Sequence, residues 1–126
     1  MADSKRIARV VKNWGWKLPM PATSGVASDF IFIREGEACS VHRHDYKWNR
    51  FVVVDGSLVI REYSPDGLAV VKKSKLVIGD MLDIPPDVVH QFYAETDVFA
   101  IEMYWGELAV DDIVRFRNAD GSVIPV

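Results

Sequence analysis

The sequence predicts an all-β protein, either a β-sandwich or a small β-barrel. From residue 30 to residue 105 the chain is a series of short runs rich in Val, Ile, Phe and Tyr, residue types that favour strands. Glycine, proline and aspartate interrupt these runs at short intervals, as they do in turns. Helical signals are sparse, and many short strands with regular turns are typical of sandwiches and barrels.

The strands are expected in a simple order along the chain. Apolar runs predict strands over residues 30–33, 39–44, 51–54, 58–63, 68–71, 76–78, 81–84, 88–93 and 98–105. Asp55-Gly56 predicts a tight hairpin, because both positions tolerate positive φ. Ser64-Pro65-Asp66-Gly67 and Pro85-Pro86-Asp87 predict further turns. At the ends, residues 5–11 are expected to form a strand and residues 111–115 one helical turn.

Length and charge restrict the classes of protein that fit. The chain has 126 residues, which suits one domain over residues 1–126. A net charge of −3, with acids and bases interspersed, argues against a nucleic-acid partner or a polybasic membrane anchor. No apolar run approaches a membrane span, and residues 1–6 lack the apolar stretch of a signal peptide. With Cys39 as its single cysteine, the chain is expected to be cytoplasmic.

The three histidines of the chain carry the main functional signal. His42 and His44 are two residues apart on a predicted strand, so their side chains share one face, with Cys39 expected on the other. His90 follows the Pro-Pro turn and enters a separate strand. Three converging imidazoles with open coordination positions are typical of a reactive metal site. We therefore predict that His42, His44 and His90 bind a divalent metal ion.

The spacing of these histidines resembles the two sequence motifs of the cupin superfamily. The first motif is glycine, five residues, His-x-His, three or four residues, glutamate, six residues and glycine. Gly36, His42, His44, Asn49 and Gly56 stand at these places, with asparagine in place of glutamate.

The second cupin motif is glycine, five residues, proline, one residue, glycine, two residues, histidine, three residues and asparagine. Gly79, Pro85 and His90 stand at the matching places, while Asp87 replaces the second glycine and Ala94 the final asparagine. The two motifs together span the middle of the chain.

The flanks resemble one group of cupins more narrowly. Asn13-Trp14-Gly15-Trp16 and the ending Asp111-Asp112-Ile113-Val114-Arg115-Phe116 are similar to segments of the isomerase domain of type II phosphomannose isomerases. The resemblance implies a double-stranded β-helix, or jelly-roll, cupin barrel. It also implies a bound Fe, Mn, Ni or Zn ion, a sugar or sugar-phosphate ligand, an isomerase-like activity and a homodimer.

Asn49 is the main departure from the cupin pattern, because cupins usually supply a carboxylate as the fourth ligand. We expect Asn49 to be a weak fourth ligand or a hydrogen-bonding neighbour of the metal site. The loss of the carboxylate leaves two alternatives open. One is an Fe(II)-dependent dioxygenase with a three-His site, and the other is a non-catalytic small-molecule-binding protein.

Glu102 is the candidate catalytic base for an isomerase, which must move a proton between neighbouring carbons. It interrupts an otherwise apolar predicted strand. Either Ala100, Glu102 and Tyr104 face the pocket, or Phe99, Ile101 and Met103 do. Charged strand residues usually face water, which favours the second arrangement. Five further aromatic residues are expected in the core, in a dimer contact or on a sugar-stacking surface, with the core or a dimer contact favoured: Trp14, Trp16, Trp48, Tyr104 and Trp105.

Overall fold

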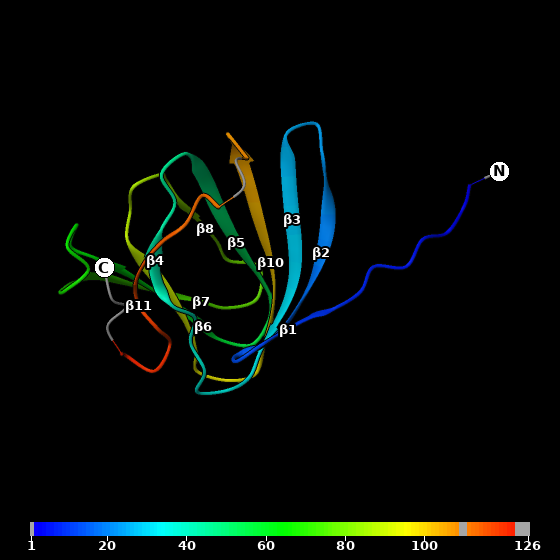
Figure 1. Ribbon diagram of the computed structural model, residues 1–126. Helices are drawn as coiled ribbons and strands as arrows, with labels where there is room; N and C mark the ends of the chain where they lie inside the picture. The colour runs from blue at the N-terminus through cyan, green and yellow to red at the C-terminus, as the bar shows by residue number, and fades with distance from the viewer. Residues whose placement is uncertain (1, 109–110, 123–126) are drawn as a thin grey trace.

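The computed structural model describes residues 2–108 and 111–122 and arranges them in two antiparallel sheets (Figure 1). The six-stranded sheet has the order β1 (Val10–Lys12), β2 (Gly15–Thr23), β3 (Val26–Ile33), β10 (Val98–Gly106), β5 (Lys47–Asp55) and β8 (Met81–Ile84). The five-stranded sheet has the order β11 (Val114–Arg117), β4 (Val41–Arg43), β9 (His90–Ala94), β6 (Leu58–Tyr63) and β7 (Val70–Leu76).

The chain changes sheet repeatedly, and this gives the fold its jelly-roll topology. From β3 onward, successive strands alternate between the two sheets except at the β6–β7 hairpin. Strands that are distant in the sequence therefore become neighbours, as β3 and β10 do in one sheet and β4 and β9 in the other. The predicted all-β, jelly-roll fold is confirmed. Within the described residues, no helix is long and apolar enough to cross a membrane.

The core lies between the two sheets and follows the period-two alternation of their strands. Ile31 and Ile33 of β3, Phe51 and Val53 of β5, and Ala100 of β10 are buried on the inner face of the six-stranded sheet. They pack against inward side chains of the five-stranded sheet, namely Leu58, Ile60, Leu76, Phe92 and Ala94. Toward one end of the six-stranded sheet the inward residues are polar and include Asp29, Asn49 and Glu102. These residues lie inside the barrel.

The predicted hairpin at Asp55-Gly56 is wrong. Its two flanking strands, β5 and β6, belong to different sheets, so Gly56 marks a crossing between sheets. The conformational argument for glycine still holds, because Gly56 has a φ of 94° and an added Cβ would lie 2.2 Å from the carbonyl oxygen of Asp97. Ser64-Pro65-Asp66-Gly67, in contrast, does join a hairpin, between β6 and β7.

Several strand boundaries also differ from the prediction. Residues 5–11 become strand only from Val10, and residues 76–78 are not a separate strand, because Leu76 ends β7 and a turn follows. No helical turn forms at residues 111–115, where Asp111 belongs to a turn and β11 begins at Val114.

Strand β2 was not predicted from the sequence, because it contains Pro19 and Pro21. β1 pairs only with Gly15–Lys17, so the proline-containing half of β2 lies at the edge of the sheet. Proline is tolerated at a sheet edge because an edge strand has N–H groups that need no ladder partner.

Candidate metal centre

The structure brings the three histidines together at one point between the sheets. His42 lies on β4 and His90 on β9, where the two residues are register partners, and His44 directly follows β4. The ring centroids are 4.5 Å apart for His42 and His90, 5.0 Å for His42 and His44, and 5.5 Å for His44 and His90. One ring nitrogen from each histidine lies within 4.8 Å of the others, and all three residues are buried.

Backbone carbonyl groups fix the tautomer of each imidazole. The Nδ1–H of His42 donates to the carbonyl of Ser40 at 2.8 Å, and that of His90 to the carbonyl of Val88 at 2.9 Å. The Nδ1–H of His44 donates to the carbonyl of Asp112 at 2.7 Å. Because a carbonyl can only accept, Nδ1 carries the proton, and Nε2 keeps its lone pair in all three rings. Metal-binding histidines are commonly oriented in this way, by a hydrogen bond from the ring nitrogen that does not bind the metal.

The three imidazoles are held neutral. Burial lowers the pKa of His90 to about 4, and it lowers the pKa of His42 well below its usual value, with His90 and His44 adding to the effect. Burial also lowers the pKa of His44. Histidine binds a metal through its neutral imidazole, so these three side chains are in the form that binds a metal at neutral pH.

The chemistry of the cluster fits a divalent metal ion. The Nε2 atoms of His44 and His90 are buried and have no hydrogen-bond partner. A buried polar atom without a partner costs free energy, which a bound cation would recover. Imidazole suits Zn, Cu, Fe and Ni, so the donor set leaves the identity of the metal open. His42, His44 and His90 thus form a site that can hold a divalent metal.

Asn49 presents a further unpartnered oxygen on the inner face of β5. The residue is fully buried, its Nδ2 donates to the carbonyl of Met103 at 3.3 Å, and its Oδ1 has no partner. An amide whose oxygen is left free in this way is available to a cation or to a ligand.

Glu102 points into the barrel, contrary to the expectation that it would face water. It is 8% exposed, as inward-facing as Ala100, whereas Phe99 and Ile101 lie on the other face of β10. The expectation failed because both faces of this sheet are apolar, so the large apolar set of β10 could lie outside. Burial raises the pKa of the Glu102 carboxyl, and hydrogen bonds with Tyr104 and Asn49 only partly oppose this.

Asp112 is a site residue that the sequence analysis missed. Its carboxylate accepts the backbone N–H groups of Asp45, Tyr46 and Lys47 at 2.7, 3.2 and 3.1 Å. Burial alone would raise its pKa, but these three N–H donors lower the pKa below the usual value. Asp112 therefore shapes the loop that follows His44. The resemblance of residues 111–116 to a family segment was the signal that could have found it.

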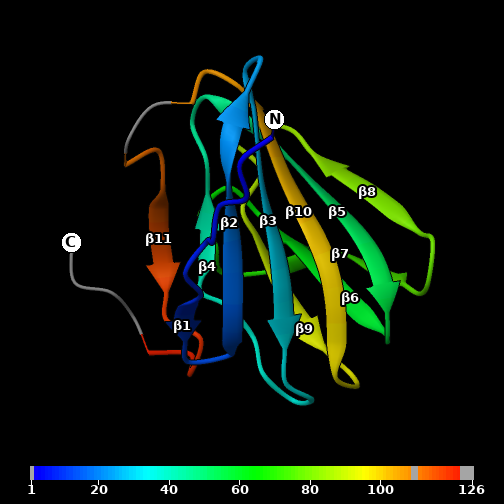
Figure 2. The same ribbon diagram turned by 90° about the vertical axis from the view of Figure 1, so that its right-hand side faces the viewer.

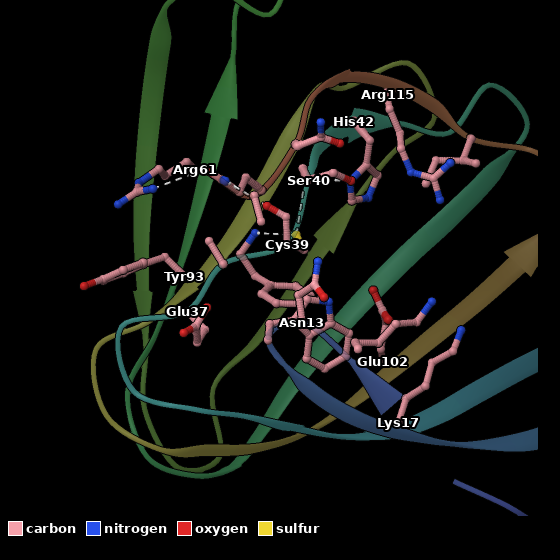
Figure 3. Close-up of a pocket in the computed structure, with 18 of the residues that line it drawn as sticks. Asn13, Lys17, Glu37, Cys39, Ser40, His42, Arg61, Tyr93, Glu102 and Arg115 are labelled. Atoms are coloured by element: carbon pink, nitrogen blue, oxygen red, sulfur yellow. Dashed lines mark hydrogen bonds between the residues drawn. The ribbon is translucent and has the colours of Figure 1, made fainter. Parts of the chain in front are cut away.

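A pocket of about 940 Å³ opens beside the histidines, between the two sheets. His42 and His44 line it, and Glu102 lines it from the opposite sheet. Figure 3 shows Lys17 and Glu102 on one side of the pocket and His42 and Arg115 on the other. Lys12 and Lys47 also line the pocket. Burial, together with repulsion from Lys17 and Arg115, lowers the pKa of Lys12.

Comparisons with known proteins identify the fold. No protein-family model matches the sequence, and neither does any curated protein. Among solved structures, a cupin superfamily protein from Desulfitobacterium hafniense matches with a TM-score of 0.63 and 15% identity, over 78% of this chain and 83% of that one. This chain has the cupin fold.

Two further cupin-fold neighbours are similar to this chain at low identity. CapF, a capsular polysaccharide assembling protein from Staphylococcus aureus, matches with a TM-score of 0.76 and 19% identity, over 89% of this chain and 34% of CapF. This chain thus spans about a third of CapF. KdgF from Halomonas sp. matches with a TM-score of 0.65 and 19% identity, over 78% of this chain and 84% of KdgF.

The two departures from the second cupin motif have local explanations. Asp87 stands where the motif has glycine and adopts a φ of 70°, a conformation that aspartate tolerates better than most residues. Its N–H donates to the carbonyl of His44 at 2.8 Å, so this turn is hydrogen-bonded to one of the three clustered histidines. Ala94 is fully buried in the core, where the asparagine of the motif would bring a polar side chain.

Cys39 is buried in the core of the cupin fold and lines the same pocket, rather than pointing to an opposite strand face. The difference arises because β4 begins only at Val41, so the alternation expected from residue 39 does not apply. Its Sγ accepts the N–H of Phe92 at 3.2 Å and donates to the carbonyl of Ser40 at 3.3 Å. Burial raises the pKa of the thiol, which leaves it a poor metal ligand.

Proposed function

We propose that this chain is a metal-dependent cupin enzyme that isomerises a sugar or sugar phosphate, in the manner of the phosphomannose isomerases that its flanks resemble. One observation carries the proposal. Three neutral imidazoles with free Nε2 atoms lie beside a pocket into which a buried carboxyl group, Glu102, also points. A metal site and a carboxyl group facing one pocket are the two parts that an aldose–ketose isomerisation needs.

In this proposal each residue has a distinct task. His42, His44 and His90 hold the metal, with Asn49 as a weak fourth ligand or a neighbour that hydrogen-bonds to the ligand. A divalent metal in this site supplies Lewis acidity toward a carbonyl and an adjacent hydroxyl oxygen. Glu102 takes a proton from one carbon and returns it to the next, while the proton of the adjacent hydroxyl passes to the carbonyl oxygen. Burial raises the pKa of Glu102 above that of an ordinary carboxyl group, which makes its carboxylate a stronger base.

The pocket wall carries both acidic and basic side chains, and the basic ones offer a place for an anionic group of the ligand. The histidines and Asn49 are neutral, so a bound dication keeps its full charge. Lys12, Lys17, Lys47 and Arg115 add cationic groups along the pocket wall, although Lys17 also lies 3.8 Å from Asp29. A sugar phosphate would place its sugar oxygens near the histidines and its phosphate near these cations. That CapF is a capsular polysaccharide assembling protein supports a carbohydrate ligand.

The donor set also supports a second candidate function, an Fe(II)-dependent dioxygenase. The observation that favours it is the presence of three neutral histidines with asparagine in place of the fourth, carboxylate ligand. The two functions predict different requirements, because an oxygenase consumes molecular oxygen and an isomerase does not. We also propose that the chain works as a homodimer in the cytoplasm.

The first experiment is elemental analysis of the protein purified without added metal or chelator, next to the His42→Ala variant. We expect about one equivalent of metal per chain, as for a single three-histidine site, and its loss in the variant. Oxygen uptake is then measured if the metal is iron, and sugar-phosphate isomerisation for any metal. Absence of metal from both proteins, with none taken up on titration, would leave a non-catalytic binding protein as the remaining function.

A further inference from the structure

A second hollow lies against the five-stranded sheet, on the side away from the core. It has a volume of about 390 Å³ and is lined by Arg61 and Tyr63 of β6, Gln91 of β9, Arg117 of β11 and the turn at residues 118–121. Figure 2 shows this turn at the lower end of β11, at the edge of the five-stranded sheet. Arg61 and Gln91 also line the pocket beside the histidines, so the two cavities adjoin.

The alternation of the strands places the polar residues of the hollow on one face of the sheet. Arg61 and Tyr63 are two residues apart on β6, so they share the face opposite to the core residue Ile60. Gln91 is the register partner of Arg61 on β9, so its side chain lies on the same face. In Figure 3, Arg61 lies on the left and His42 on the right. The hollow and the three histidines therefore lie on opposite faces of the five-stranded sheet.

Gln91 holds Arg61 and Tyr63 in place through its side-chain amide. Its Oε1 accepts an N–H of Arg61 at 3.1 Å and the hydroxyl of Tyr63 at 2.9 Å, and its Nε2 donates to the carbonyl of Cys39 at 2.8 Å. The residue is only 5% exposed. A buried amide that is hydrogen-bonded at both ends has a fixed orientation. The groups that it binds are therefore positioned before any ligand arrives.

The two arginines of the hollow lie over tyrosine rings. The guanidinium of Arg61 is 4.8 Å from the centre of the Tyr93 ring, and that of Arg117 is 5.4 Å from the centre of the Tyr63 ring. Arg117 also donates to the carbonyl of Gly67. These contacts restrict two long side chains that would otherwise have many rotamers. A ligand that binds them consequently loses less conformational entropy than one that binds free arginines.

Neither arginine forms an ion pair with a carboxylate in the part of the chain that the structure describes. A guanidinium has five N–H donors, and the contacts above use one donor of Arg61 and one of Arg117. Asp120 is the acidic residue among those that line the hollow, and its carboxylate accepts the N–H of Ser122 at 2.8 Å. Two cations and one anion leave the hollow with a net positive charge and with further N–H donors for a ligand.

We propose that this hollow binds the phosphate group of a small phosphorylated molecule, between Arg61 and Arg117. Guanidinium groups match phosphate oxygens with pairs of parallel hydrogen bonds. A phosphate monoester carries a charge of about −1.5 to −2 at pH 7 and has three acceptor oxygens, so it can accept from both arginines. The volume of about 390 Å³ is within the range of small-molecule sites. This inference does not depend on the proposed isomerase activity, because phosphate binding is measured without turnover.

The experiment is calorimetric titration of inorganic phosphate into the native chain, Arg61→Met, Arg117→Met and Lys73→Met. Arg117 lines the hollow but not the pocket beside the histidines. Lys73 is exposed on β7, is the register partner of Arg61 and lines neither cavity, so Lys73→Met removes the same charge as a matched control. Phosphate affinity should fall at least about 10-fold in each arginine variant. In about 0.1 M salt, which screens distant charges, Lys73→Met should bind like the native chain.

A nitrogen-15 NMR titration of the native chain supplies a second test that needs no variant. Phosphate in the hollow should shift the side-chain amide signal of Gln91 more than that of Asn49, which lies inside the barrel. Far-ultraviolet circular dichroism shows whether the arginine variants are folded, and the NMR result decides if they are not.

Three results would overturn the proposal. They are a native chain that binds no phosphate, a folded Arg117→Met that binds it as tightly as the native chain, and a phosphate that shifts Asn49 but not Gln91. Equal weakening in Lys73→Met and Arg117→Met would also overturn it, because it would show attraction to the general positive charge of this face. A chain that binds phosphate through Arg117 but isomerises no sugar phosphate would contradict the proposed activity and support this site.

Discussion

His44 and Asp112 are joined at two points, although they are far apart in the sequence. The Nδ1–H of His44 donates to the backbone carbonyl of Asp112, and the Asp112 carboxylate accepts the N–H of Asp45, the residue that follows His44. One residue therefore orients the imidazole and also fixes the loop beyond it. Asp112, two residues before the start of β11, acts as a brace that holds both His44 and the loop after it.

The brace predicts a specific effect of Asp112→Asn. The variant keeps the backbone carbonyl but loses the charge that accepts three N–H groups, so metal affinity should fall about 10-fold to 100-fold. Unfolding of the metal-free protein should become easier by roughly 1–3 kcal/mol. Metal titration and urea denaturation measure the two effects. Asp111→Asn, at an exposed neighbouring position, is the control. Equal metal affinity in the two variants would show that the loop needs no brace.

The buried histidines predict that the metal-free protein loses stability in mild acid. The unfolded imidazole of His90 takes up a proton near pH 6.5, but the folded one does so only near pH 4, because its pKa is lowered to about 4. Between these values the unfolded state binds more protons, so the free energy of unfolding falls as the pH is lowered. The loss assigned to His90 is roughly 3 kcal/mol.

The pH prediction is checked by urea denaturation between pH 7 and pH 4. The difference between native protein and His90→Gln isolates the histidine from buried acids such as Glu102, whose raised pKa acts in the opposite direction. We expect the advantage of the native protein to shrink as the pH falls. Parallel curves for the two proteins would mean that His90 is protonated to the same extent when folded and unfolded.

Asn49→Asp tests whether the free amide oxygen lies beside the metal. Aspartate has nearly the same shape, so it adds a negative charge without a steric change. If Oδ1 faces the ion, metal affinity should rise at least 10-fold, while the metal-free protein becomes less stable because a charge is buried. Calorimetric metal titration and thermal unfolding give both values. Unchanged affinity would remove Asn49 from the neighbourhood of the ion.

Glu102→Gln separates proton transfer from metal binding. Glutamine keeps the size and the hydrogen bonds but cannot carry the proton, so the turnover number should fall about 100-fold to 10,000-fold. Metal content should remain at the native level, because Glu102 is not one of the clustered histidine ligands. Turnover on the substrate that supports the native enzyme is compared with elemental analysis of the same sample. Undiminished turnover would assign the proton transfer to a different group.

Lys47→Met tests the preference for an anionic ligand. The Lys47 Nζ lies 4.2 Å from the Tyr104 ring at the pocket wall, and methionine retains much of its length without the charge. Binding of a sugar phosphate should weaken about 10-fold, the effect of losing one charged hydrogen bond. Binding of the matching neutral sugar should hardly change. An equal loss for both ligands would indicate a packing role for Lys47.

The parts of the fold that could be predicted depend on local signals. Strand β6 and the turn after it followed from an apolar run and a turn sequence, and both are present as expected. Pairing between distant strands leaves no local signal, and this is why Asp55-Gly56 was interpreted as a hairpin when it joins two sheets. The convergence of the three histidines was predictable because their spacing resembles a known pair of motifs.

The orientation of Glu102 and the role of Asp112 could not be predicted, for different reasons. The alternation of β10 allowed Glu102 to lie on either face of the sheet. The rule that charged residues face water favoured the wrong face, because the side of this sheet away from the core is itself apolar. Asp112 acts through hydrogen bonds to residues more than sixty positions away. Such contacts form only after β11 has paired with β4, and no periodic pattern in the sequence indicates them.

The pairing of β4 with β9 also determines when the metal centre can exist during folding. His42 and His44 are near neighbours in the chain, but His90 reaches them only after a loop of about 50 residues has closed, a slow and entropically costly event. An unfolded chain can offer a metal two adjacent imidazoles at most. The complete donor set therefore forms late, and bound metal would act on the rate of unfolding more than on the rate of folding.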